Sequence, residues 1–155
     1  MPIAIITGAS AGIGSAVAGL FLEADYTVYN LARRECPLSG VNNLRCDLRD
    51  ADSLDQALAV LLPAVASADS VALIHNASQM RKDAAVNCSD EALTAVLEVN
   101  VTGINSLNRR LLPAMPATSS VIYVGSTLSE KAVPGAFSYV VSKHAQLGMM
   151  RATCQ

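Results

Sequence analysis

The sequence predicts an α/β fold, in which a doubly wound parallel sheet carries helices on both faces. Two observations support this prediction. Short apolar runs alternate along the chain with longer segments whose apolar residues recur at helical spacing. The first apolar run also ends in a glycine-rich turn that leads directly into a helical segment. Strands that alternate with helices form parallel sheets through right-handed crossovers, so five strands in the order 3-2-1-4-5 are expected.

Short apolar runs mark the expected strands, and longer periodic segments mark the expected helices. The strands are expected at residues 3–6, 26–31, 43–46, 70–74 and 120–124. The helices are expected at residues 13–24, 51–67, 89–112 and 139–151. In the third helix Ser89 is the expected N-cap and Pro113 the expected stop, because proline cannot continue a helix.

Composition and charge limit the classes of function. Of the 155 residues, 52% are hydrophobic and only 15% are charged, and the net charge is −2. Nucleic-acid and anionic-membrane surfaces require clustered Lys and Arg, so neither partner is expected. The length suits one domain over residues 1–155. The high apolar content predicts surface buried between copies, in a homodimer or homotetramer.

Cysteine spacing and the apolar stretches indicate where the protein resides. Cys36, Cys46, Cys88 and Cys154 show neither the close pairing of a zinc or redox motif nor a compact disulfide framework. The first residues lack the basic start and long apolar region of a signal peptide. The longest apolar stretch, residues 57–66, is far shorter than the roughly 18 residues that span a bilayer. A reduced, cytoplasmic setting without a bound metal is expected.

The turn after the first strand has the pattern Thr7-Gly8-x-x-x-Gly12-x-Gly14. Glycine permits backbone angles and a close approach that a Cβ would block. The helix that follows presents N–H groups and the positive end of its dipole, which suit a pyrophosphate. A tight turn without a ligand is the alternative. The expected dinucleotide contacts are Gly8, Ser10, Gly12, Ile13 and Gly14.

Two arginines follow the second strand, where the adenosine ribose of a dinucleotide would lie. An acidic side chain at this place binds the ribose 2′-hydroxyl, whereas an arginine accommodates a 2′-phosphate. Here Arg33 and Arg34 occupy the place, and the first carboxylate is Glu35. NADP(H) is therefore expected in preference to NAD(H), with Arg33 as the phosphate partner and Arg34 as a second. A solvated basic turn is the alternative.

Tyr139 and Lys143 are one helical turn apart in the last expected helix, so they share a face. A free tyrosine has a pKa of about 10, and a nearby cation favours its ionised form. Lys143 is the candidate cation. Ser126 could hydrogen-bond a reacting carbonyl oxygen while a nicotinamide delivers hydride. The three residues predict interconversion of a carbonyl and an alcohol, and a surface Tyr-Lys pair is the alternative.

Asn100 interrupts the apolar face of the long helix, where Leu97 and Ile104 are its neighbours. A buried amide needs hydrogen-bond partners. Two interpretations stay open. The amide has a functional role, or it is satisfied by nearby backbone.

Taken in order, these motifs resemble the short-chain dehydrogenase/reductase family. The motifs are the glycine turn, Asp47-Leu48, Asn76-Ala77, Asn100-Val101-x-Gly103, Ser126 and Tyr139-x-x-x-Lys143. The resemblance covers the whole chain and implies a Rossmann-like fold. It also implies a catalytic tetrad, in which Tyr139 exchanges the proton and Lys143 also holds the nicotinamide ribose. The tetrad is Asn100, Ser126, Tyr139 and Lys143.

The resemblance implies further cofactor contacts and shows two departures. It implies that Asp47 and Leu48 line the adenine, that Asn76 and Ala77 lie against the cofactor, and that Asn100 holds a water in a proton relay. The family's Asn-Asn-Ala-Gly here begins with His75 and ends with Ser78. Because His75 ends a buried strand, a packed and hydrogen-bonded histidine is expected there rather than a catalytic one.

Members of the family typically continue well past the Tyr-x-x-x-Lys helix, so the C-terminal strands are expected to be missing and the domain incomplete. The strand at residues 120–124 would then be an exposed edge, and it carries none of the charges that protect edges. We expect the isolated chain to pair through this edge, to aggregate, or to be one part of a longer polypeptide.

Three functions are compatible with these features. The leading one is an NADP(H)-dependent oxidoreductase that acts on a small-molecule carbonyl or alcohol. The second is a non-catalytic nucleotide-binding or oligomerising module derived from such an enzyme. The third, an epimerase-like use of the same fold, is disfavoured because those relatives are normally longer.

Overall fold

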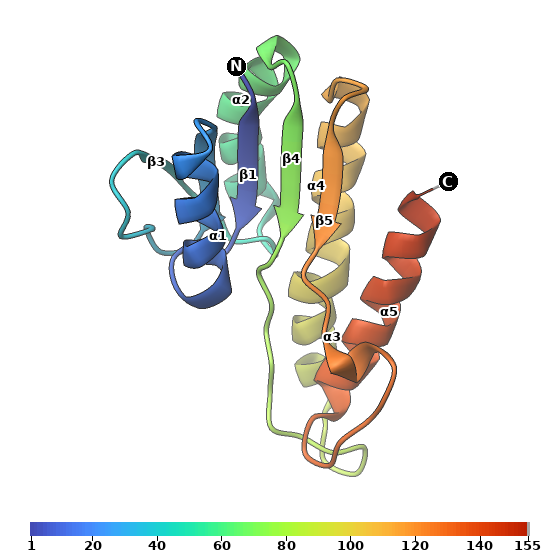
Figure 1. The fold of residues 1–155 in the computed structure, drawn as a ribbon. Helices are drawn as coiled ribbons and strands as arrows, with labels where there is room; N and C mark the ends of the chain where they lie inside the picture. The colour runs from blue at the N-terminus through green and yellow to red at the C-terminus, as the bar shows by residue number, and fades with distance from the viewer. Residues whose placement is uncertain (155) are drawn as a thin grey trace.

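The computed structural model describes residues 1–154 and contains a parallel sheet with helices on both sides (Figure 1). The strands are β1 (Ile3–Thr7), β2 (Thr27–Ala32), β3 (Val41–Arg45), β4 (Val71–His75) and β5 (Ser120–Tyr123). Their order is β3-β2-β1-β4-β5, and every neighbouring pair is parallel. The predicted fold class and strand order are confirmed.

Helices pack on both faces of the sheet. They are α1 (Gly12–Glu23), α2 (Ala51–Ser67), α3 (Asp90–Leu97), α4 (Gly103–Leu111) and α5 (Phe137–Thr153). Successive side chains of a strand point to opposite faces. Ile3 and Ile5 of β1 therefore join the apolar cluster of α2 and α4, whereas Ala4 and Ile6 join the cluster under α1. These two cores hold the strands together. Because all the strands are parallel, their carboxyl ends lie at the same end of the sheet.

Several element boundaries differ from the prediction by one or two residues. The strand predicted at residues 43–46 begins at Val41, because Val41 pairs with Val28 of β2. The helix predicted at residues 139–151 begins at Phe137 and ends at Thr153. Such ends depend on contacts between segments that are distant in sequence, which apolar periodicity does not report.

The prediction of one uninterrupted helix over residues 89–112 is wrong. A π-helical turn, Glu98–Thr102, joins α3 to α4, and Gly103 N–H donates to Glu98 O within it. A π-helical turn holds more residues than an α-helical turn, and such turns are frequent at functional sites. The predicted helix start is confirmed, because Ser89 Oγ accepts from Ala92 N at 3.2 Å.

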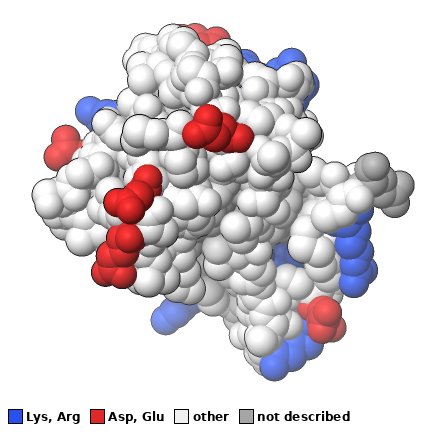
Figure 2. Space-filling view, turned by 45° about the horizontal axis from the view of Figure 1, so that its top comes forward, with Lys and Arg blue, Asp and Glu red and all other residues white. Residues whose placement is uncertain are grey.

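Figure 2 shows charged side chains scattered over the face in view rather than gathered into a basic stripe. None of the helices within residues 1–154 is both long and apolar enough to cross a membrane. The same residues bring together no group of three or more His, Cys, Asp or Glu side chains that could hold a metal ion.

Candidate functional site

A cavity of about 480 Å³ lies at the carboxyl ends of the central strands, where the strand order reverses between β1 and β4. Ligands of doubly wound sheets bind at this point. The predicted nucleotide contacts that line the cavity are Gly8, Ser10, Arg33, Arg34, Asp47, Leu48, Asn76 and Ala77. The other predicted contacts are not part of its lining: Gly12, Ile13 and Gly14 lie in the first turn of α1, and Tyr139 and Lys143, also expected to contact the cofactor, lie on α5.

The glycine turn has the backbone shape that its sequence predicts. Gly8 has φ +74° and Gly12 has φ +58°, in the left-handed region that favours glycine. A Cβ on Gly14 would lie 2.4 Å from Gly8 O and 2.5 Å from Asn76 Nδ2, so no larger residue fits. The N-cap of α1 is Ala11, which has no side-chain acceptor for the first N–H groups of the helix. An anionic ligand suits this helix end.

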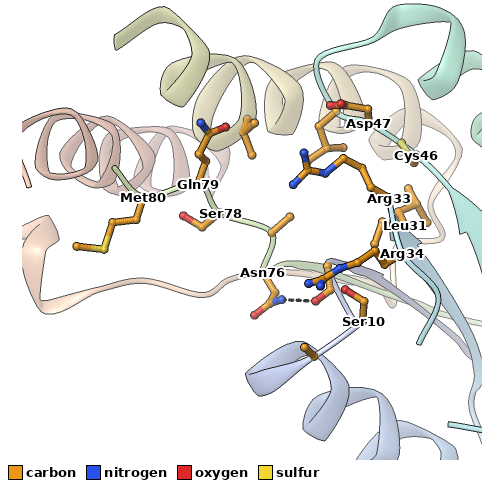
Figure 3. A pocket seen from close by; sticks show the side chains of 16 residues that line it. Ser10, Leu31, Arg33, Arg34, Cys46, Asp47, Asn76, Ser78, Gln79 and Met80 are labelled. Atoms are coloured by element: carbon orange, nitrogen blue, oxygen red, sulfur yellow. Dashed lines mark hydrogen bonds between the residues drawn. The ribbon is translucent and has the colours of Figure 1, made fainter. Parts of the chain in front are cut away.

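Asn76 joins the end of β4 to the glycine turn. Its Nδ2 donates to Gly8 O at 3.0 Å (Figure 3) and also to Thr7 O at 3.1 Å. Thr7 Oγ1 accepts from the N–H groups of Asn76 and Ala77, both at 3.0 Å. These bonds hold two segments that are far apart in sequence on one wall of the cavity.

Arg33 and Arg34 reach over the same cavity from the end of β2 (Figure 3). Their turn is held by Asn30, whose Nδ2 donates to Arg34 O at 3.1 Å and whose Oδ1 accepts from Ala9 N at 2.9 Å. Within residues 1–154, neither guanidinium forms an ion pair with a carboxylate. Both positive charges are therefore available to an anion in the cavity.

Asp47 and Leu48 form a further wall. The Asp47 carboxylate accepts from Arg49 Nη2 at 3.1 Å, and this bond holds the pKa of Asp47 below its ordinary value. Leu48 packs so closely against α4 that a Cβ on Gly103 would lie 2.8 Å from Leu48 Cβ. Burial raises the pKa of the neighbouring Cys46 thiol to about 11. That thiol is therefore protonated at neutral pH and is a poor nucleophile.

Lys143 is a buried cation beside Tyr139 on α5. The residue is 2% exposed, and its Nζ lies 5.6 Å from the centre of the Tyr139 ring. Nζ donates to Val124 O at 3.1 Å and to Gln146 Oε1 at 2.9 Å. Burial lowers the pKa of Lys143, because the ammonium group loses hydration. Lys143 is buried and Tyr139 is half-buried, so the two do not form the exposed Tyr-Lys pair of the alternative interpretation.

Asn100 lies in the π-helical turn and is fully buried. Its Oδ1 accepts from Gln79 N at 2.7 Å, and its Nδ2 donates to Gln79 O at 2.8 Å and to Ser142 Oγ at 2.9 Å. Neighbouring backbone therefore satisfies the amide, as one of the two interpretations predicted. The same amide also connects α5 to the segment that follows β4.

Ser126 follows β5, and its Oγ accepts from Leu128 N at 3.1 Å, which caps a short 3₁₀ turn. The lining of the cavity includes Gln79 but none of Ser126, Tyr139 and Lys143. Gln79 also bonds to Asn100. Eight of the predicted nucleotide residues thus surround one cavity, and Gln79 links that cavity to the tetrad residue Asn100.

Two residues that hold this region in place were missed by sequence reasoning. Asp83 accepts from Ser138 Oγ at 2.5 Å and from Ser138 N at 3.0 Å in the first turn of α5, and these bonds hold the pKa of Asp83 below its ordinary value. Its partner is 55 residues away, so no local pattern reveals it. Gln146 is the second, and its spacing from Lys143 on one helix face is a signal that could have found it.

His75 is packed and hydrogen-bonded, as predicted. It is 1% exposed, and its Nε2 lies 2.8 Å from Asn108 Oδ1. Asn108 Nδ2 in turn donates to Tyr123 OH at 2.7 Å. Because an amide oxygen can only accept, His75 Nε2 carries the proton. Burial lowers the pKa of His75 to about 4.

Known proteins are similar to this chain in sequence and in structure. An A-factor type γ-butyrolactone 1′-reductase (1S-forming) of Streptomyces virginiae is 34% identical to this chain. The alignment is 167 residues long and covers 96% of this chain. A 4-hydroxyisoleucine dehydrogenase complexed with NADH and succinate superposes with a TM-score of 0.86 at 25% identity, over 97% of this chain and 71% of that one. An actinorhodin polyketide ketoreductase variant with NADPH superposes with a TM-score of 0.87 at 25% identity, over 98% of this chain and 63% of that one.

The similarity to the reductase extends over only part of that enzyme, because this chain spans 63% of its length. The sequence model of the family described as short chain dehydrogenase matches residues 2–155. Since this match omits only the first residue, the chain belongs to the short-chain dehydrogenase/reductase family.

Proposed function

We propose that this chain is the nucleotide-binding and proton-transferring part of an NADP(H)-dependent oxidoreductase that interconverts a small-molecule carbonyl and its alcohol. The observation that carries the proposal is the buried Lys143 ammonium group, 5.6 Å from the centre of the Tyr139 ring. Buried charges are costly to retain and are typical of functional sites. Relatives named as reductases and dehydrogenases support this class of reaction, and the two solved structures named above contain NADH or NADPH.

The cavity suits a dinucleotide in both shape and charge. The close packing of Gly14 on Gly8 keeps the N-terminus of α1 beside the cavity, where its N–H groups suit a pyrophosphate. Bound NADP(H) supplies or accepts a hydride. In this proposal Gly8, Ser10, Gly12, Ile13 and Gly14 hold the pyrophosphate, Arg33 and Arg34 the 2′-phosphate, Asp47 and Leu48 the adenine, and Asn76 and Ala77 the part nearer the nicotinamide.

Each tetrad residue has a defined role in the proposed reaction. Ser126 donates a hydrogen bond to the reacting carbonyl oxygen. Tyr139 gives that oxygen its proton in reduction and takes the proton back in alcohol oxidation. Lys143 favours the phenolate through its positive charge and binds the nicotinamide ribose. Asn100 holds α5 and the segment after β4 together through Ser142 Oγ and Gln79.

Nucleotide titration is the first test. We expect NADPH fluorescence to change on binding, with an affinity about tenfold or more above that for NADH, because charge-assisted bonds from arginine favour the 2′-phosphate. A chain that binds neither nucleotide would contradict the proposal.

Tyr139→Phe tests proton transfer. The substitution removes the hydroxyl but little volume, so NADPH-dependent turnover of a carbonyl panel should fall by roughly 100-fold or more. NADPH affinity, measured by the same fluorescence titration, should stay largely unchanged. An equal loss of turnover and affinity would mean that Tyr139 serves binding rather than proton transfer.

A nucleotide-binding or oligomerising module without turnover is the second candidate. It is favoured by the cavity itself, whose lining contains nucleotide residues but none of Ser126, Tyr139 and Lys143. NADPH binding without oxidation across the carbonyl panel would support the module. Oxidation that depends on Tyr139 would reject it.

A further inference from the structure

Gln146 is buried on α5 between two members of the proposed tetrad. It is 2% exposed, and its Oε1 accepts from Lys143 Nζ at 2.9 Å. Its Nε2 donates to Asn100 O at 3.5 Å. The amide of one side chain therefore bridges the buried ammonium group and the main chain of the π-helical turn.

The surroundings of Lys143 make this contact important. The ammonium group donates to Val124 O and to Gln146 Oε1, and the first of these acceptors is fixed by the backbone after β5. Within residues 1–154 no carboxylate lies within ion-pairing distance of it. The titratable side chain that faces it is Tyr139. A buried ammonium group needs acceptors to stay charged.

We propose that Gln146 is a positioning residue that holds Lys143 Nζ beside Tyr139 and couples it to Asn100. This inference rests on the proposed function, in which the charge of Lys143 favours the Tyr139 phenolate. The family resemblance implies that Asn100 holds a relay water, and in this structure the Asn100 carbonyl accepts a hydrogen bond from the Gln146 amide. The acceptor Gln146 Oε1 favours the charged form of Lys143. Because an amide does not ionise, Gln146 itself takes no part in proton transfer.

Direct titration of Lys143 tests the inference without nucleotide or turnover. The chain has three lysines, and the other two, Lys82 and Lys131, are exposed and serve as internal references. Carbon-13 NMR of the lysine ε-carbons would follow each titration. Gln146→Met keeps the length of the side chain but removes the acceptor. The midpoint of the Lys143 titration should therefore fall by about one pH unit or more.

A second variant and a control make the outcome decisive. Gln146→Glu places a carboxylate next to the ammonium group and should move the Lys143 midpoint upward, a reversal that a general loss of packing would not produce. Gln56→Met makes the same chemical change at an exposed position of α2 and should leave the Lys143 midpoint unchanged. The same Lys143 midpoint in the parent, Gln146→Met and Gln146→Glu proteins would overturn the inference.

Turnover provides a separate readout. In alcohol oxidation the acid limb of the pH profile should move to higher pH in Gln146→Met, because a less charged Lys143 favours the phenolate less, and it should stay in place in Gln56→Met. An unchanged acid limb in Gln146→Met would also overturn the inference. A chain that shows no turnover contradicts the proposed function instead, and the NMR titration still decides the role of Gln146.

Discussion

Arg33 and Arg34 lie where the proposed function places the adenosine ribose, and their charges should select the nucleotide. We expect Arg33→Asp to lower NADPH affinity by about tenfold to 100-fold, because a hydrogen bond to a charged group contributes about 1.5–3 kcal/mol. NADH affinity should stay or rise, since a carboxylate can bind the 2′-hydroxyl. Fluorescence titration measures both affinities.

Arg109 provides the matched control for this change. It is exposed on α4, so Arg109→Asp alters the net charge equally and should leave both affinities unchanged. Similar losses of NADPH and NADH affinity in Arg33→Asp would show that Arg33 supports the turn rather than selecting the nucleotide.

His75 should make stability depend on pH. Its pKa is about 4 in the folded protein and 6.5 ordinarily, so the unfolded chain binds more protons between these values. The free energy of unfolding should therefore fall as pH decreases from 6.5 to 4, by on the order of 3 kcal/mol for this group. Urea unfolding at a series of pH values measures it.

Two substitutions isolate the part that His75 contributes. His75→Phe keeps a ring in the site and should reduce the fall in the free energy of unfolding between pH 6.5 and pH 4. His144→Gln replaces an exposed histidine and should leave that fall as it is in the parent protein. If the parent and His75→Phe proteins lose the same free energy over this range, other groups cause the dependence.

Individual site residues differ in how far the sequence reveals them. The glycine turn and the Tyr139-Lys143 pair are local patterns, and the structure places each where its spacing predicts. Asp83 and Gln79 act through bonds to residues far away in the chain, and no local pattern reports those partners. Contacts of this kind depend on how the elements pack, which one sequence does not report.

At the scale of elements, the main error of prediction was the uninterrupted helix over residues 89–112, which missed the π-helical turn. Apolar residues continue at helical spacing through residues 93–107, so periodicity gave no reason to interrupt the helix. The π-helical turn holds Asn100, whose amide bonds to Gln79 and Ser142. Those bonds join three segments that are distant in sequence, and apolar periodicity does not report such contacts.

Gly14→Ala tests the contact between α1 and the turn that precedes it. The added Cβ would meet Gly8 O at 2.4 Å and would force the two segments apart. We expect a loss of about 1–3 kcal/mol in the free energy of unfolding, as is usual for overpacking. NADPH affinity should fall as well. Urea unfolding and fluorescence titration measure the two effects.

Gly148 is the matched control on α5. It has no atom within 4 Å of an added Cβ, so Gly148→Ala should be neutral or should stabilise the protein by up to about 1 kcal/mol. Unchanged stability and NADPH affinity in Gly14→Ala would mean that α1 can move away from the turn without consequence.

At the scale of the whole molecule, the alternation of strands and helices was sufficient to predict the fold. The order β3-β2-β1-β4-β5 follows from right-handed crossovers and is confirmed. Periodicity did not predict that α5 packs against α3 and the π-helical turn. That packing depends on particular bonds, such as the one between Asn100 in the π-helical turn and Ser142 on α5.

β5 forms one edge of the sheet, and this edge carries a prediction about association. Ile122 is 43% exposed there, whereas β4 beside it is fully buried, and Figure 1 shows β5 as the outermost strand on this side of the sheet. Exposed apolar edges pair with other chains. We expect the chain to form homodimers or larger assemblies, so light scattering should give a mass above that of one chain.

Ile122→Lys should lower that mass, because a charge at the edge opposes pairing. Val60→Lys introduces the same charge at a half-exposed position of α2 and should leave the mass unchanged. A monodisperse monomer for the parent chain over a range of concentrations would contradict the prediction.

The parallel sheet also has a consequence for the order in which the molecule folds. No two neighbouring strands are joined by a hairpin, because every pairing is parallel. The bond between Asn76 and Gly8 spans 68 residues, so a long loop must close before it forms. Loop closure of this kind slows folding. We therefore expect the nucleotide cavity to be completed late in folding, so that added nucleotide stabilises the folded chain without hastening its formation.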